Sequence, residues 1–251
     1  MDAKIIREKA LQFGADLVGM TKLEKFNGVA PENDPRNIFP QGKSMIMLAR
    51  RIPRGVLRGI EHAHAPNGAF DDFGLYMLED QFLTKATYDL VIYMESFGCE
   101  AVPMFCYDSE AAAKFPLGCP VAPGKPAPNV YVDWKLAARL CGLGEVGKNG
   151  LFITPEFGTL QRFSMLITDV ELPAGEIIDR KVCDNCDACQ KACTFNNLCS
   201  KCTSGAVHTN IGRFNTIDKI AAACGRSCLA SLEARGLITR KLTTAFRNEV
   251  K

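Results

Sequence analysis

The sequence predicts a mixed α/β protein with a second, smaller domain rich in cysteine. Predicted helices and strands alternate over residues 1–175, which is typical of α/β domains. Eight of the 12 cysteines lie within 183–228. A chain of 251 residues, 47% of them hydrophobic, buries a core without needing disulfide bonds. We therefore predict an α/β domain over 1–175 and a small cysteine-rich domain over 176–251.

The first predicted elements are a helix and two strands. Residues 3–14 carry apolar side chains at helical spacing, and the pattern stops at Gly14. The apolar run 15–20 follows as a strand. A loop rich in Pro, Asn and Asp at 30–41 leads to the continuous apolar run 44–49, which suits a strand buried on both faces.

The clearest predicted helix covers 76–97 and ends before Gly98. Its expected apolar face consists of Leu78, Phe82, Leu83, Ala86, Leu90, Val91, Met94 and Phe97. Further along we predict a strand at 101–105, a helix at 133–141, a glycine-rich turn at 142–150 and a strand at 162–169. The five prolines of 115–130 make that segment an irregular loop, lying either over an active site or at the surface.

The cysteine-rich segment has the spacing of an iron–sulfur protein. Its run C-x2-C-x2-C-x3-C, from Cys183 to Cys193, is the run found in bacterial ferredoxins. It predicts that Cys183, Cys186 and Cys189 hold one [4Fe–4S] cluster with a distant cysteine, and that Cys193 joins a second cluster. The remaining candidate ligands are Cys199, Cys202, Cys224 and Cys228. The spacing leaves open which of them completes which cluster.

A structural zinc site is the alternative for the same cysteines. The pair Cys183 and Cys186 with the pair Cys199 and Cys202 matches a tetrahedral site, but it leaves Cys189 and Cys193 unused. The other cysteines share no spacing and are expected to pack as small hydrophobic residues. They are Cys99, Cys106, Cys119 and Cys141.

Charge and cysteine usage bear on the compartment and on the class of partner. A net charge of +2 creates no field that would attract nucleic acid or an anionic membrane. The sequence has no secretory signal pattern and no apolar run of about 18 residues. Thiols in such a chain are typical of a reducing compartment. We expect a cytoplasmic protein with no membrane partner and no nucleic-acid partner, while a tRNA substrate stays open.

The glycine-rich turn has two conventional interpretations. The pattern G-x-G-x2-G occurs at Gly142, Gly144 and Gly147, yet a dinucleotide fingerprint follows a strand and this one follows a predicted helix. The phosphate-binding pattern G-x4-G-K-[ST] also fails, because Asn149 follows Lys148. Neither pattern assigns a nucleotide to the turn.

This turn, the segments 153–158 and 166–169, and the ferredoxin run together resemble the epoxyqueuosine reductase and reductive dehalogenase superfamily, in particular a short branch of it. The resemblance covers about 130–230. It implies a nitroreductase-like α/β domain that binds cobalamin with its lower base detached, followed by a small two-cluster ferredoxin-like module. The implied corrin contacts are Leu143, Gly144, Glu145, Gly147, Lys148, Asn149, Gly150, Thr154, Pro155, Phe157 and Gly158. Asp133 stands too close to the turn for the catalytic aspartate of epoxyqueuosine reductases.

The predicted function is an oxidoreductase that passes electrons from two [4Fe–4S] clusters to base-off cobalamin, which reduces a small-molecule substrate. An external ferredoxin, flavodoxin or reductase would supply the electrons. Candidate proton donors beside the proline-rich loop are Tyr107, Asp108 and Tyr131. One alternative is an electron-transfer protein that serves a corrinoid protein or another redox partner without its own cobalamin. The other is a flavin-dependent reductase, because the nitroreductase-like fold also accommodates flavin.

Overall fold

A computed structural model describes residues 1–62, 68–106, 122–124, 130–176, 182–184, 186–196 and 218–239. The chain forms two compact units. Unit 1 consists of Met1–Arg50, Glu79–Leu143 and Phe163–Ile178, and unit 2 of Arg51–Leu78, Gly144–Arg162 and Asp179–Lys251. The two units alternate along the sequence, and the domain boundary at residue 175 stays a prediction.

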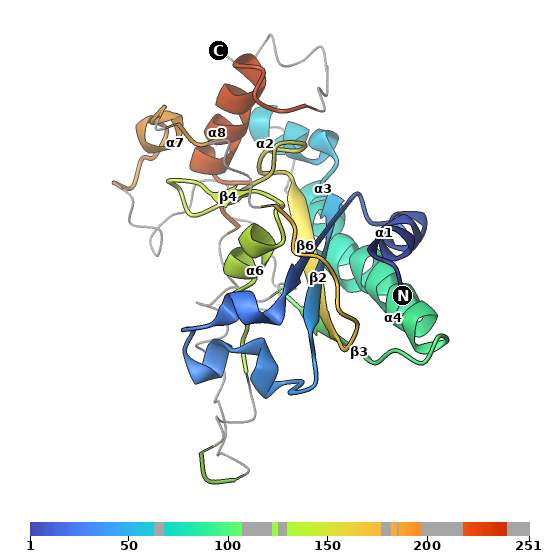
Figure 1. Cartoon of the computed structure of the whole chain (residues 1–251). Helices are drawn as coiled ribbons and strands as arrows, with labels where there is room; N and C mark the ends of the chain where they lie inside the picture. The colour runs from blue at the N-terminus through green and yellow to red at the C-terminus, as the bar shows by residue number, and fades with distance from the viewer. Residues whose placement is uncertain are drawn as a thin grey trace. The chain divides into compact units, whose positions relative to one another are not determined.

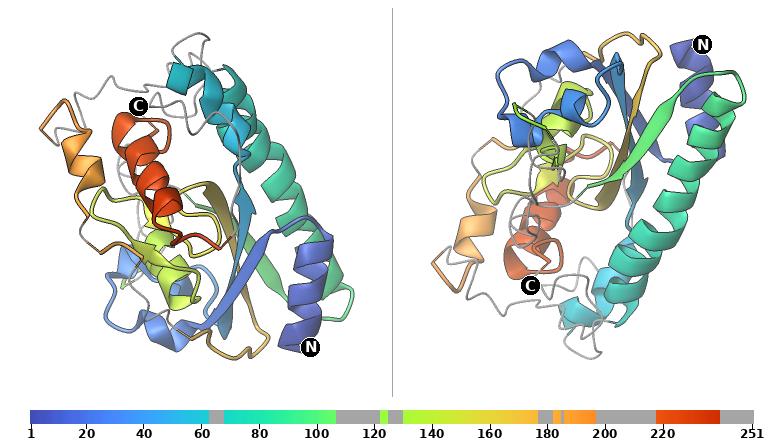
Figure 2. Two further views of the ribbon diagram at one scale, coloured as in Figure 1. Left: turned by 90° about the horizontal axis from the view of Figure 1, so that it is seen from above. Right: turned by 90° about the horizontal axis from the view of Figure 1, so that it is seen from below.

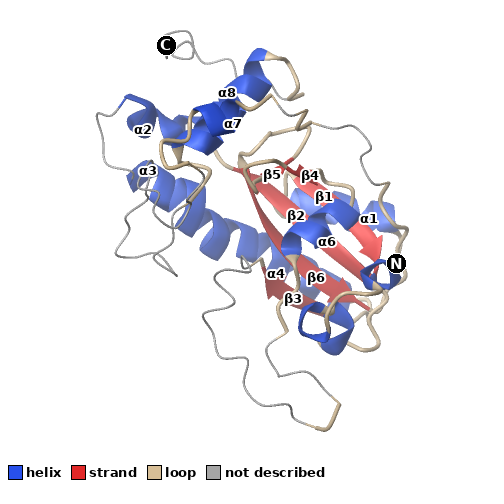
Figure 3. Ribbon diagram, turned by 90° about the vertical axis from the view of Figure 1, so that its left-hand side faces the viewer, coloured by secondary structure: helices blue, strands red, loops and turns tan. Residues whose placement is uncertain are grey.

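A four-stranded sheet forms the centre of unit 1. Its strands are β1 (Leu17–Lys22), β2 (Ser44–Arg51), β6 (Gln161–Thr168) and β3 (Ala101–Phe105), which lie side by side in the order β1-β2-β6-β3 (Figure 3). Strand β1 runs antiparallel to β2, with Leu17 opposite Ala49, and β3 runs antiparallel to β6, with Ala101 opposite Thr168. The first six residues of β2 are buried, so the prediction of a strand covered on both faces is confirmed.

Helices cover both faces of this sheet. Helices α1 (Ala3–Gln12) and α4 (Thr84–Glu95) pack on one face, and α6 (Trp134–Leu140) lies on the other (Figures 1 and 2). Asp2 and Asp133 cap α1 and α6 by accepting backbone N–H groups, which gives Asp133 a structural role. None of the helices within the described residues is both long and apolar enough to cross a bilayer.

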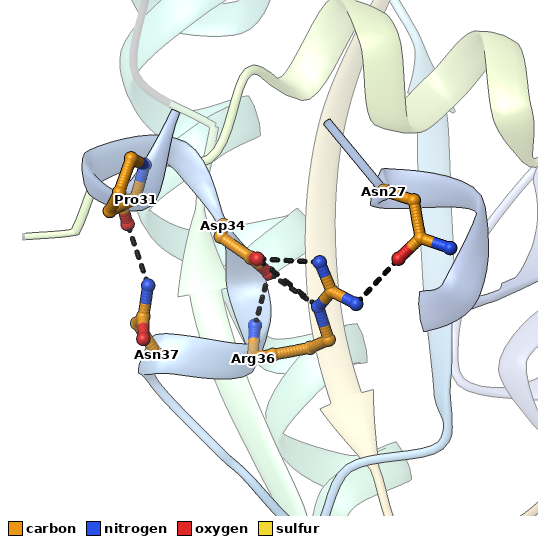
Figure 4. Close-up of polar contacts among 5 residues, drawn as sticks. All are labelled: Asn27, Pro31, Asp34, Arg36 and Asn37. Carbon is orange, nitrogen blue, oxygen red and sulfur yellow. Dashed lines mark hydrogen bonds and ion pairs between the residues drawn. The ribbon is translucent and has the colours of Figure 1, made fainter. Parts of the chain in front are cut away.

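The predicted loop 30–41 contains two 3-10 turns, η2 (Pro31–Asn33) and η3 (Pro35–Asn37), and a third turn, η1 (Leu23–Phe26), precedes it. The Arg36 guanidinium donates to the Asp34 carboxylate at 2.7 Å and to Asn27 Oδ1 at 2.7 Å (Figure 4). Asn37 Nδ2 donates to the carbonyl oxygen of Pro31 at 2.8 Å. These polar contacts join the two turns, while the buried Phe39 and Pro35 pack inward.

The predicted helix 76–97 divides into two helical forms. A π-helical stretch, η5 (Asp72–Leu83), precedes α4, and α4 ends at Glu95. Phe82 and Phe97 are 42% and 63% exposed, so their assignment to the apolar face was wrong. The i→i+5 pairing of a π-helix turns Phe82 away from the α-helical face, where the Arg50 guanidinium covers its ring at 5.3 Å. Phe97 lies beyond α4 and contacts the Tyr93 ring.

Unit 2 is built from short elements. These are η4 (Arg54–Leu57), α2 (Arg58–His62), α3 (Gly68–Asp71), the hairpin of β4 (Glu145–Val146) and β5 (Phe152–Ile153), α7 (Ala188–Lys191) and α8 (Ala223–Ala234). Helices α7 and α8 lie side by side (Figures 1 and 2). Its core includes Ile52, Leu57, Phe70, Ile153, Leu229 and Leu232. The apolar residues of α8 therefore fix that helix on the hairpin and on the segments around η4.

A buried ion network also joins α8 to η4 and α2. The Arg54 guanidinium donates to both carboxylate oxygens of Glu61, at 3.0 and 2.7 Å, and lies 3.7 Å from the carboxylate of Glu233 on α8. These side chains are 6%, 7% and 13% exposed. A charge buried to this degree is tolerated only while its partner is present.

Replacing Arg54 by Met should destabilise the protein by about 3 kcal/mol, because two carboxylates would lose their buried partner. Urea denaturation of the anaerobically reconstituted chain measures the change. The control is Lys85→Met, which removes an exposed pair with Asp89 and should cost less than about 1 kcal/mol. Equal stability of the two variants would contradict a supporting role for Arg54.

Candidate metal centre

Four cysteines of unit 2 line one pocket. They are Cys183, Cys186, Cys189 and Cys228. Three come from the segment that leads into α7, and Cys228 comes from α8, 39 positions beyond Cys189 in the sequence. The structure thus brings together the first three cysteines of the ferredoxin run and one distant cysteine.

Local backbone geometry positions the first three thiols. Asp187 adopts a left-handed conformation, with φ of 59°, which turns the chain sharply before α7. Cys189 lies in the first turn of α7 and is 8% exposed, whereas Cys186 is exposed. Ser227 Oγ on α8 donates to the carbonyl oxygen of Ala188 at 3.0 Å. This bond ties the helix that carries Cys228 to the helix that carries Cys189.

The remaining cluster candidates lie partly beyond the described residues. Cys224 and Cys228 are four positions apart on α8, so they occupy the same side of the helix on successive turns. Cys224 and Cys193 are both half-buried. Cys199 and Cys202 lie outside the described residues. Within the described part of the chain, no three His, Cys, Asp or Glu side chains lie close enough together to hold a single metal ion.

The glycine-rich turn forms a wall of the cysteine pocket. The backbone N–H of Lys148 donates to Cys183 Sγ at 3.4 Å. Glu145 Oε1 accepts the backbone N–H groups of Val182 and of Cys183, the latter at 2.7 Å. Lys148 Nζ pairs with the Asp187 carboxylate at 2.6 Å. The turn is therefore bound to the cysteine segment at two places, near Cys183 and at Asp187.

The thiols of the pocket differ in how readily they ionise. Burial raises the pKa of Cys228 to about 12 and also raises the pKa of Cys189. A hydrogen bond with Ser231, 3.5 Å away, lowers the pKa of Cys186. The two cations at the rim, Lys148 and Arg235, already pair with Asp187 and Asp184. A bound metal centre would provide the positive charge that four thiolates need.

Solved structures with a similar chain path are reductases. An epoxyqueuosine reductase from Streptococcus thermophilus matches 100% of this chain and 62% of its own, with 16% identity and a TM-score of 0.51. A selenomethionine-labelled epoxyqueuosine reductase matches 90% and 64%, with 15% identity and a TM-score of 0.55. A reductive dehalogenase described with a mechanism for B12-dependent dehalogenation matches 77% and 25%, with 17% identity and a TM-score of 0.55. The chain shares their fold.

The resemblance predicted from the sequence is thereby confirmed at the level of the fold. The chain spans less than two thirds of the length of these reductases. No family model and no curated protein sequence matches it. The mixed α/β class is confirmed as well, and the two-cluster ferredoxin-like module stays a prediction.

The predicted corrin contacts lie in a segment that is packed mainly against its own unit. A Cβ atom on Gly144 would lie 2.1 Å from the carbonyl oxygen of Ile153, and one on Gly158 would meet Leu229, Leu232 and Ile238 on or just beyond α8. Thr154 Oγ1 is buried and lies 3.1 Å from both the N–H of Phe157 and Gln161 Oε1. Internal packing therefore accounts for these glycines and for Thr154, and a role in corrin binding stays a prediction for the whole set.

Of the predicted proton donors, only Tyr131 falls in the described part of the chain. Its backbone N–H donates to the carbonyl oxygen of Glu32 at 2.9 Å, and its carbonyl oxygen accepts Asn33 Nδ2 at 2.5 Å. Tyr107 and Asp108 lie outside the described residues. Catalytic roles for all three stay predictions.

Sequence reasoning missed three side chains on α8 and its end that serve the pocket: Ser227, Ser231 and Arg235. Ser231 and Arg235 follow Cys228 at steps of three and four residues, which is the spacing of one helical face. A helical projection that started from Cys228 would have found them. Asn149, a predicted corrin contact, lines the cysteine pocket, and its role at a corrin stays a prediction.

Replacing Gly225 by Ala should loosen the helix that carries Cys228. A Cβ atom there would lie 2.0 Å from the carbonyl oxygen of Lys219, so backbone must move, at a cost of about 1–3 kcal/mol. We expect a lower melting temperature and less retained iron after anaerobic reconstitution. Gly55→Ala is the control, because nothing lies within 4 Å of its Cβ position. Unchanged iron retention in Gly225→Ala would contradict this role.

Proposed function

We propose that the chain is an iron–sulfur oxidoreductase that passes electrons from two [4Fe–4S] clusters to a base-off cobalamin, where a small-molecule substrate is reduced. The observation that carries the proposal is the pocket shared by Cys183, Cys186, Cys189 and Cys228. Cysteine thiolates are the usual ligands of such clusters. The likeness of the fold to epoxyqueuosine reductases and a dehalogenase supports the reductase class.

The pocket supports a definite division of the cysteines between the clusters. The four thiols that line it would hold the first cluster. The second would take the other four candidates, Cys193, Cys199, Cys202 and Cys224. This division follows the rule that the fourth cysteine of a ferredoxin run serves the other cluster. In this division Cys193, just after α7, and Cys224, in the first turn of α8, would serve the second cluster.

The donor set fits a cluster better than it fits one zinc ion. Four thiols, three from one segment and one from α8, are the ligand set that a [4Fe–4S] cluster takes. Zinc requires four ligands about 2.3 Å from one point. The turn at Lys148 adds a backbone N–H aimed at Cys183 Sγ, a donor of the kind that tunes iron–sulfur centres.

The residues of the chain have separate tasks in this proposal. The buried Cys189 would shield one side of the first cluster from water, while the exposed Cys186 would leave another side open to an electron donor. Lys148 and Asp187 hold the turn in place beside it. Cobalamin, when bound, supplies a strongly reducing cobalt centre. Residues of 143–150 and 154–158 are the proposed corrin contacts, and Tyr107, Asp108 and Tyr131 are the proposed proton donors.

A second function has one observation in its favour. Gly144 and Gly158 are already in close contact with the chain itself, so their lack of a side chain does not require a ligand. An electron-transfer protein that serves a corrinoid partner would have the same cysteine pocket without binding cobalamin. Metal analysis of the reconstituted protein separates the two functions.

Anaerobic reconstitution with iron and sulfide should give about eight irons and eight sulfides per chain. Added cobalamin should then bind stoichiometrically, and electron paramagnetic resonance of its Co(II) form should show no coupling to a nitrogen ligand. Full iron content without cobalt would favour the electron-transfer protein. Bound flavin in place of cobalt would favour the flavin reductase. A protein that takes up zinc and no iron would contradict the proposal.

Replacing Cys228 by Ala should remove the first cluster and leave about four irons per chain, because the pocket would lose its only thiol from α8. Cys99→Ala is the matched control, because Cys99 is half-buried in unit 1. This variant should retain about eight irons per chain. Iron and acid-labile sulfide are measured on both. Full iron content in Cys228→Ala would show that another residue completes the cluster.

A further inference from the structure

The side chain of Asn149 presents an amide donor to the cysteine pocket. Asn149 lines the pocket with its Nδ2 fully buried, and its side chain interacts with the Cys228 thiol, which lowers the pKa of that thiol. Its Oδ1 accepts the backbone N–H of Leu151 at 3.1 Å. The turn is closed by two further bonds of 2.8 Å, from Gly147 N–H to the Leu151 carbonyl and from Gly150 N–H to the Gly147 carbonyl. The orientation of the amide is therefore fixed by the backbone.

Two donors of this turn lie beside thiols of the two segments that line the pocket. The backbone N–H of Lys148 donates to Cys183 Sγ at 3.4 Å. The side chain of the next residue, Asn149, lies beside the thiol of Cys228 on α8. One turn therefore approaches a thiol from each side of the pocket.

A buried amide N–H costs about 1–3 kcal/mol unless it has an acceptor. The acceptor beside the Asn149 side chain is the sulfur of Cys228. Sulfur atoms of an iron–sulfur centre carry negative charge, which makes them better acceptors than neutral thiols. Hydrogen bonds to these sulfurs are one of the factors that set cluster potentials.

We propose that Asn149 is a tuning residue for the first cluster: its Nδ2–H group donates to a cluster or cysteine sulfur beside Cys228 and raises the one-electron reduction potential. The inference rests on the proposed function only in requiring that this cluster is present. The reduced cluster carries one more negative charge than the oxidised cluster, so a donor stabilises the reduced form more. Lys148 contributes its backbone N–H on the opposite side, at Cys183.

Two variants separate the loss of the donor from a change in charge. Asn149→Asp preserves the size of the side chain and an oxygen that accepts the Leu151 N–H, and replaces the amide donor by a carboxylate oxygen. Asn149→Leu removes the donor without adding charge. The control is Asn37→Asp in unit 1. This variant also loses a hydrogen bond donated by a side-chain amide, to the carbonyl oxygen of Pro31, and gains the same charge (Figure 4).

Midpoint potentials are measured by anaerobic redox titration of the reconstituted full chain, with iron content determined for every sample. We expect the reduction equilibrium of Asn149→Leu to fall about tenfold, which is about 59 mV for a one-electron couple. Asn149→Asp should fall further, and Asn37→Asp should match the wild type. A normal potential in Asn149→Leu at full iron content overturns the inference. A lower midpoint potential in Asn149→Asp alone also overturns the inference, because the added charge rather than the lost donor would then explain it.

A second measurement decides the matter if the variants do not retain the cluster. Wild-type protein labelled with 15N-asparagine is reduced and studied by pulsed electron paramagnetic resonance. Coupling of an asparagine nitrogen to the reduced cluster supports the inference, and its absence overturns it. Failure of the proposed function is distinct, since it appears as missing iron in the wild type before any variant is compared.

Discussion

The thiols of Cys183, Cys186, Cys189 and Cys228 share one pocket, although burial raises the pKa of two of them. Holding four thiolates there requires a compensating positive charge, and the nearest cations are already paired with carboxylates. The architecture of unit 2 serves this arrangement. Helix α8 is held against α7 by Ser227, against the core by Leu229 and Leu232, and beside Arg54 by Glu233.

The residues of the glycine-rich turn are explained by their contacts with the cysteine pocket. Glu145 and Lys148 bind the backbone and a side chain of the cysteine segment, and Asn149 turns its amide toward the thiols. Gly144 allows the close contact between the turn and β5. A turn built in this way can influence a metal centre whether or not it also contacts a corrin. The same residues are therefore relevant to the reductase and to the electron-transfer alternative.

Much of the fold could be predicted from local patterns. The strands of unit 1 and the helices at 3–14 and 133–141 are found close to their expected positions, because apolar periodicity and capping residues act over a few positions in sequence. Phe82 and Phe97 were misplaced, since the π-helical stretch changes which side chains share a face. The order β1-β2-β6-β3 and the alternation of the two units could not be predicted, because both depend on contacts between distant segments.

The sequence by itself determined that three cysteines, two residues apart, share one site, because such spacing constrains the backbone locally. It also determined which segments form the central strands. Only the tertiary structure decided that Cys228 lines the same pocket and that the Asn149 side chain lies beside it. Spacing could not choose between Cys224 and Cys228, one helical turn apart, since the choice depends on how α8 packs against α7 and on the close approach at Gly225. The contact between α7 and α8 joins segments separated by tens of residues, and side-chain packing rather than local propensity sets its geometry.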